Sequence, residues 1–217
     1  MTTIKTLLFD LDGTLIDSRV DLASAVNFAL KSAGRPMKSQ DEIIPHVGNG
    51  LRILLGNVMG PSDSPSMEKA IAGFSYYYLD HCVDKTTLYD GVRDTIESFS
   101  GKITMGIVTN KPKVFSEMII KSLGLAPFIS FIIGGDSLPE RKPHPAPLFE
   151  ALKALNGSPT SALMLGDGPQ DIQAGHAAGT QTAVARYGYG YRPETLDLKP
   201  DYVVDRFTDL KEIVGCH

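Results

Sequence analysis

The chain has 217 residues, of which 42% are hydrophobic, and this suffices for a buried core domain with a smaller second domain. Its 21 basic and 25 acidic side chains give a formal net charge of -4 at pH 7. This balance provides no strong basic field and argues against a nucleic-acid partner, but it leaves open a small anionic ligand held by a few local groups.

Short apolar runs closed by polar residues predict a series of buried strands. In chain order these runs span residues 4–9, 103–108, 131–133, 162–165, 182–185 and 202–204. Helical spacing of apolar residues lies between them, at 92–99, 113–123, 147–155 and 169–178. The alternation predicts an α/β fold, with a Rossmann-like, mostly parallel sheet and helices on both faces.

The segment 19–85 breaks this alternation, because it contains helical patterns and no convincing strand. The helical patterns are DLASAVNFALKSAG, which ends at the helix-stopping Gly34, then GLRILLGNVMG and MEKAIAGFSYYYLDHC. We expect a small helical cap domain, 19–85, inserted after the first strand of a core domain formed by 1–18 and 86–217. Ligands of parallel sheets bind at the carboxyl ends of the strands, so such an insert would lie over the site as a lid.

The ends of four predicted strands carry polar side chains suited to one kind of chemistry. They supply four carboxylates, a hydroxyl, an amide and two lysines: Asp10, Asp12, Thr109, Asn110, Lys111, Lys142, Asp167 and Asp171. Converging carboxylates repel each other by roughly 3 kcal/mol at about 5 Å and an effective dielectric constant near 20, so they need a cation. Oxygen ligands select a hard ion such as Mg²⁺, and the remaining groups can bind an anion, as phosphoryl transfer requires.

The two acids in LLFDLDGTLIDS can divide the chemistry between them. One carboxylate must attack phosphorus, and the other must protonate the leaving alkoxide and then take a proton from water. Asp10 as nucleophile and Asp12 as general acid and base fit this division. The turn at Gly13 can bring backbone N–H groups to the phosphate.

Each of these motifs also has a purely structural interpretation. A D-x-D-G sequence is common in acidic surface turns, and Asp171 suits the first turn of a helix. Thr109 and Asn110 can cap a helix that begins near Pro112, and Lys142 can be a solvated loop residue. Their joint placement at successive strand ends favours a functional site.

The same residues resemble the haloacid dehalogenase superfamily of phosphohydrolases over essentially the whole chain. The four motifs of that family are similar to DLDGTL, VTNK, RKPHP and GDGPQD here, in the same order and spacing. One departure is Gly168-Pro169 after Asp167, where a Ser or Thr is more usual in the family.

This resemblance implies roles for the individual residues. Asp10 would form an aspartyl-phosphate, and Asp12 would be the general acid and base. Asp10, the Asp12 backbone carbonyl and Asp167 would hold Mg²⁺, with Asp171 acting directly or through water. Phosphate binding would fall to Thr109, Asn110 and Lys142.

Further stretches resemble the phosphoglycolate phosphatase branch of the superfamily, which implies 2-phosphoglycolate as the preferred substrate. In the cap, GNG would be a specificity loop, with Asn49 and Arg52 as candidate contacts; a guanidinium such as that of Arg52 suits a substrate carboxylate. Arg52 can equally be a surface charge on a helix.

Other functions stay open at this point. The chain can instead hydrolyse a sugar phosphate or pyrophosphate. A sugar phosphomutase of this group carries a histidine soon after the first motif, and IDSRVDLASAV has none. A non-enzymatic phospho-acceptor would not need Asp12.

Cysteine content and the N-terminal sequence predict the cellular setting. Cys82 and Cys216 are far apart and have no metal-like spacing, so we expect two reduced thiols. No signal peptide or membrane-spanning run is evident. We expect a cytoplasmic protein, a monomer or homodimer, that binds a small phosphorylated metabolite and neither a membrane nor nucleic acid.

Overall fold

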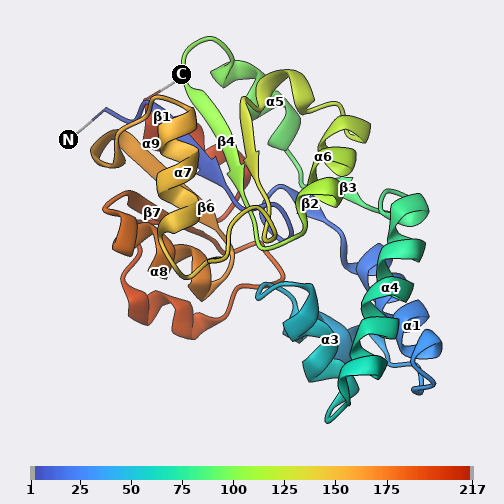
Figure 1. The fold of residues 1–217 in the computed structure, drawn as a ribbon. Coiled ribbons are helices and arrows are strands. Elements are labelled where there is room, and N and C mark those ends of the chain that lie inside the picture. Colours follow the sequence, from blue (N-terminus) through green and yellow to red (C-terminus); the bar gives the residue numbers. More distant parts are fainter. Residues whose placement is uncertain (1–2, 216–217) are drawn as a thin grey trace.

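The computed structural model describes residues 3–215 and contains a six-stranded parallel sheet in the order β5-β4-β1-β6-β7-β8 (Figure 1). Its strands are β1 (Thr6–Phe9), β4 (Thr104–Val108), β5 (Phe131–Ile133), β6 (Ala162–Gly166), β7 (Gln181–Ala185) and β8 (Tyr202–Val204). Each lies within a residue or two of a predicted strand, so the expected parallel sheet is confirmed.

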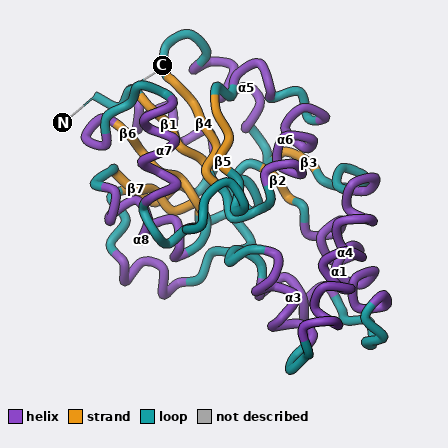
Figure 2. The backbone as a smooth tube through the Cα atoms, in the orientation of Figure 1, coloured by secondary structure: helices purple, strands orange, loops and turns teal. Residues whose placement is uncertain are grey.

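Helices surround this sheet and form the segment after its first strand (Figure 2). They are α1 (Arg19–Ser32), α2 (Gln40–Ile43), α3 (Leu51–Met59), α4 (Ser64–His81), α5 (Val92–Phe99), α6 (Lys113–Ser122), α7 (Ala146–Ala154), α8 (Pro169–Ala178) and α9 (Leu210–Val214). Short 3₁₀ helices occur at Ile44–His46, Ala126–Phe128, Pro159–Ser161, Pro193–Leu198 and Phe207–Asp209.

Both faces of the sheet are covered, which explains the continuous apolar character of β1. All four residues of this strand are buried. Because side chains alternate along a strand, Leu7 and Phe9 belong to the apolar cluster that includes α5 and α6 residues, whereas Leu8 packs with residues of α7 and α8. Helices therefore lie on both faces, as the sequence predicts.

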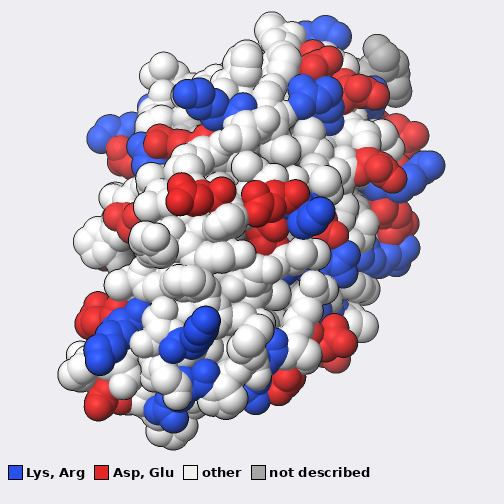
Figure 3. Space-filling view, turned by 90° about the vertical axis from the view of Figure 1, so that its right-hand side faces the viewer, with Lys and Arg blue, Asp and Glu red and all other residues white. Residues whose placement is uncertain are grey.

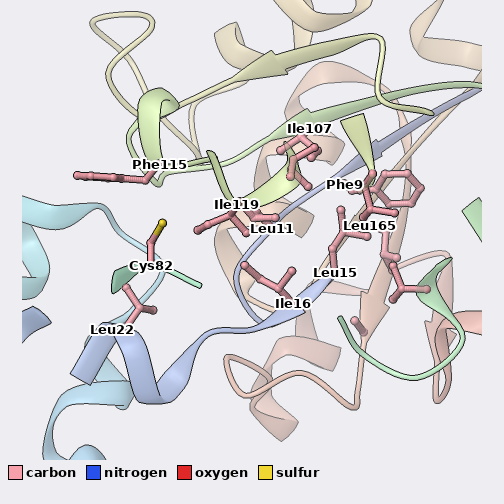
Figure 4. Packing of buried hydrophobic residues seen from close by; sticks show 14 of the residues in the cluster. Phe9, Leu11, Leu15, Ile16, Leu22, Cys82, Ile107, Phe115, Ile119 and Leu165 are labelled. Atoms are coloured by element: carbon pink, nitrogen blue, oxygen red, sulfur yellow. The ribbon is translucent and has the colours of Figure 1, made fainter. Parts of the chain in front are cut away.

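The helices α1, α3 and α4 stand apart from the sheet in Figure 1. Two short antiparallel strands, β2 (Ile16–Asp17) and β3 (Thr87–Leu88), pair where the chain leaves the core and returns to it. Figure 4 shows apolar side chains of this region, among them Ile16 and Leu22, between the sheet and the helices. We propose that 19–85 is a cap domain and that 1–18 with 86–217 is the core domain.

Some local structure differs from the sequence expectation. The strands β2 and β3 were not predicted, because two residues are too few to show a periodic pattern. The helix α4 begins at Ser64, before the predicted start at residue 67. Asp63 caps it by accepting a 2.8 Å hydrogen bond from the Ser66 N–H, and Pro65 suits the first turn, so residues interpreted as a turn begin the helix.

Charged side chains of both signs share the surface, and on the face shown in Figure 3 the acidic and basic ones are interspersed. Cys82 is buried and forms no disulfide among the described residues, whereas Cys216 lies outside them. Among residues 3–215, no helix combines the length and the apolar character needed to cross a membrane.

Asp21, in the first turn of α1, joins the two chain segments that connect the cap to the core. Its side chain is buried and accepts hydrogen bonds from the Lys85 N–H at 2.9 Å and the Thr86 N–H at 2.8 Å. The Thr86 hydroxyl donates a further bond to it at 2.7 Å. The Asp21 carboxylate thus accepts hydrogen bonds from the backbone N–H groups of Lys85 and Thr86, where the chain returns to the core.

We expect Asp21→Ala to lower the free energy of unfolding by about 2–4 kcal/mol, because buried N–H groups would lose a charged acceptor. Urea denaturation measures this loss. The matched control is Asp41→Ala, an exposed acid in the first turn of α2, which should cost less than about 1 kcal/mol. Equal losses for the two variants would contradict the role of Asp21.

Candidate functional site

Acidic and basic side chains meet at the carboxyl edge of the central strands. Asp10 follows β1, Thr109 follows β4, Lys142 lies in the loop after β5, and Asp167 follows β6. The strands β4 and β6 both pair with β1, and the chain crosses from one side of β1 to the other, so these ends surround a topological switch point. The predicted convergence of Asp10, Thr109, Lys142 and Asp167 is found.

Three buried aspartates form the centre of the site. Ligand oxygens of Asp10, Asp167 and Asp171 all lie within 4.8 Å of one another. The Lys142 ammonium, with 1% of its side chain exposed, lies 3.1 Å from Asp10 Oδ1 and donates to Asp171 Oδ1 at 2.6 Å. Asp171 also accepts from the Gly168 N–H at 3.0 Å. Asp171 therefore caps the first turn of α8 and also belongs to the acidic triad.

The burial of these groups changes their protonation. The pKa of Asp10 is raised from 3.8 to about 6, chiefly by loss of hydration; the charge of Lys142 opposes this effect and the charge of Asp171 adds to it. Burial, followed by the charges of Asp10 and Asp171, raises the pKa of Asp167 well above its usual value. Burial also lowers the pKa of Lys142, but its two carboxylate neighbours outweigh this and leave the pKa raised. One ammonium does not neutralise three carboxylates.

These observations fit a bound metal ion. Asp10 Oδ1 is buried and accepts no hydrogen bond from the described residues, and its near neighbour is the Lys142 ammonium at 3.1 Å. A buried oxygen without a partner is costly unless another ligand uses it. Oxygen donors from Asp10, Asp167 and Asp171 are the set that a hard divalent cation prefers.

Glycines allow the chain to close around Asp167. Gly13 has a φ of +81°, and a Cβ atom at this position would lie 1.8 Å from Asp167 Oδ2. The Gly190 N–H donates a 2.6 Å hydrogen bond to the same oxygen. Gly190 was not among the predicted site residues, although the YGYG pattern of 187–190, whose glycines lie against Asp167, could have indicated it.

Asp12 lies outside the metal triad and has its own set of partners. Lys111 Nζ donates to its two carboxylate oxygens at 2.9 and 2.8 Å, and Ser18 Oγ donates to Oδ1 at 2.5 Å. The Tyr189 hydroxyl lies 3.0 Å from Ser18 Oγ. Lys111 was noted at a strand end without an assigned role, and the sequence offered no signal for Ser18 or Tyr189, because their contacts arise only from the fold.

Thr109 and Asn110 use their side chains differently. Thr109 Oγ1 accepts from the Lys111 N–H at 3.2 Å, which leaves its O–H free to donate. The Asn110 amide donates to Lys142 O at 2.9 Å and to Gly48 O at 2.8 Å, and its oxygen accepts from the Lys142 N–H at 3.0 Å. Asn110 therefore holds the Lys142 loop and the cap loop in place.

The cap residues Asn49 and Arg52 are not brought to the site. Both are exposed, and Arg52 Nη2 forms a 2.7 Å ion pair with Glu68 Oε1 of α4. The pocket beside Asp10 and Asp12 is lined on the cap side by Gly48, Gly50 and apolar residues, and by neither Asn49 nor Arg52. The surface-charge interpretation of Arg52 therefore describes this structure.

The chain belongs to the haloacid dehalogenase-like hydrolase family, whose sequence model matches residues 7–185. It is 36% identical to a phosphoglycolate phosphatase of Colwellia psychrerythraea, over 95% of each chain. It is 35% identical to a phosphoglycolate phosphatase of Aquifex aeolicus, over 99% of this chain and 98% of that one. The crystal structure of a predicted phosphoglycolate phosphatase from Haemophilus somnus 129PT matches with a TM-score of 0.92 and 33% identity, covering 98% of this chain and 99% of that one.

We expect Asp10→Asn to stabilise the metal-free protein at pH 7. A carboxyl whose folded-state pKa is raised from 3.8 to about 6 lowers stability progressively as the pH rises through that interval. The amide removes this loss, a gain on the order of 2 kcal/mol.

Thermal or urea unfolding in the presence of a chelator measures this effect, and the gain should disappear as the pH falls from 6 to 4. The matched control is Asp197→Asn, at an exposed aspartate. A gain of the same size for the control, or a gain that grows in acid, would contradict the assignment.

Proposed function

We propose that the protein is a Mg²⁺-dependent phosphatase of a small phosphorylated metabolite, with 2-phosphoglycolate as the preferred substrate. The observation that carries this proposal is the arrangement of two neighbouring aspartates with different partners. Asp10 lies in the acidic triad beside Lys142, whereas Asp12 lies in the pocket beside Lys111. Such a pair suits a nucleophile and a separate acid and base.

The reaction would proceed in two displacements. A carboxylate oxygen of Asp10 attacks phosphorus, the bond from phosphorus to the ester oxygen breaks, and Asp12 gives its proton to the departing oxygen. Asp12 then takes a proton from water, which attacks the phosphorus of the aspartyl-phosphate and releases inorganic phosphate. Thr109 and Lys142 would hold the phosphoryl oxygens, and Asn110 would position the Lys142 loop.

Metal binding would involve Asp10, Asp167, Asp171 and the backbone carbonyl of Asp12. When bound, Mg²⁺ supplies positive charge that offsets the repulsion between the carboxylates and the phosphoryl group. Lys142 keeps Asp10 and Asp171 in place, and the Gly190 N–H fixes one oxygen of Asp167.

The relatives named phosphoglycolate phosphatase support the substrate assignment. A sugar phosphate or pyrophosphate is the alternative substrate, and a sugar phosphomutase on the same fold the alternative enzyme. The apolar cap wall of the pocket, which includes Leu51, Leu54 and Phe74, offers a polyhydroxyl leaving group few partners and favours a smaller one. We expect the enzyme to act in the cytoplasm as a monomer or homodimer.

Phosphate release from a panel of phosphorylated metabolites tests this function. With Mg²⁺, 2-phosphoglycolate should give the highest kcat/KM, and a chelator should abolish turnover. Asp10→Asn should lower kcat by at least about 10⁴-fold, because the amide cannot act as the nucleophile. Arg52→Ala is the control and should retain activity. Near-wild-type turnover in Asp10→Asn would refute the nucleophile assignment.

Asp12→Asn tests the general acid through the leaving group. An alkyl phosphate, whose alkoxide needs a proton, should slow by about 10²–10⁴-fold, whereas an aryl phosphate with a stable phenolate should slow much less. The measurement is kcat/KM for a matched pair of esters. Equal losses on the two esters would exclude Asp12 as the proton donor.

A further inference from the structure

A second lysine faces the pocket, and the two displacement steps do not account for it. Lys111, whose side chain is 4% exposed, is separate from Lys142 and contacts Asp12 alone among the carboxylates of the described chain. Its ammonium also lies 4.8 Å from the ring centroid of Tyr78 on α4, so it connects the strand end to the cap. A buried lysine is retained at a cost in hydration, which a bound anion can offset.

Tyr78, whose ring lies against this lysine, carries a hydroxyl without a hydrogen-bond partner among the described residues. The residue lines the pocket and is fully buried, yet its hydroxyl finds no partner within residues 3–215. The ring is fixed by edge-on packing against Phe115, with centroids 5.1 Å apart, and by Phe74 at 5.0 Å. Because Tyr78 lines the pocket, its buried hydroxyl is available to donate to a ligand that supplies an acceptor.

We infer that Lys111 and Tyr78 form a subsite for a carboxylate on the leaving group, which makes the substrate class a small carboxylate-bearing phosphate monoester. This inference rests on the proposed phosphatase function and assigns to these two residues the specificity that the sequence analysis gave to Arg52. In 2-phosphoglycolate the carboxyl carbon is two bonds from the ester oxygen. A cation that contacts Asp12 is therefore within reach of that carboxylate when Asp12 protonates the ester oxygen.

The test compares 2-phosphoglycolate with 2-hydroxyethyl phosphate, which replaces the carboxylate with a neutral alcohol group. Tyr78→Phe keeps the ring and removes only the hydroxyl, and it should lower the ratio of the two kcat/KM values by about tenfold. Lys111→Met should lower that ratio by about 10²-fold or more, because a buried charge partner is lost. Any effect on Asp12 that is common to both esters cancels in the ratio.

Matched controls carry the same substitutions outside the pocket. Tyr76→Phe, at a residue that is 72% exposed, and Lys113→Met, at a lysine paired with Glu117, should leave the ratio unchanged. If Tyr78→Phe and Lys111→Met slow both esters equally, the carboxylate subsite is overturned while the phosphatase function stands. If the wild type hydrolyses neither ester, the proposed function fails and this inference fails with it.

Discussion

The ammonium of Lys142 between the carboxylates of Asp10 and Asp171 makes the carboxyl edge of the sheet possible. Strands β1 and β6 pair in parallel, so the acids that follow them must be neighbours. Buried at 1% exposure, Lys142 offsets part of the repulsion, but three carboxylates exceed its single charge. Burial raises the pKa of Asp10 to about 6, Lys142 opposes this rise, and the charge of Asp171 adds to it. The three carboxylates can together hold a further cation.

The two aspartates of the first motif differ because the fold gives them different neighbours. Asp10 continues the buried strand and belongs to the triad, whereas Asp12 lies two residues further along the chain and contacts Lys111 and Ser18. This separation gives each carboxylate its own lysine. A nucleophile and an acid can then work side by side, because each carboxylate has a different source of electrostatic stabilisation.

The cap is joined to this chemistry by a few specific contacts. The Asn110 amide bonds to both the Gly48 carbonyl and the Lys142 backbone, and the Lys111 ammonium lies against the ring of Tyr78. The pocket is thus a shared surface of strand ends and cap helices. A ligand that enters it would contact both parts at once, and under the proposed function this would connect substrate selection by the cap to catalysis in the core.

The sequence alone determined the parallel sheet, its helices and the motif residues at the strand ends, because apolar runs and turn residues act locally along the chain. It could not determine which lysine serves which aspartate, because Lys111 and Asp12 are brought together only by strand pairing. Likewise, the residue type of Arg52 suits a substrate carboxylate, but the packing of α3 against α4 places its guanidinium in an ion pair with Glu68. Tertiary structure decided these pairings because they depend on distances between segments far apart in the chain, which no local pattern encodes.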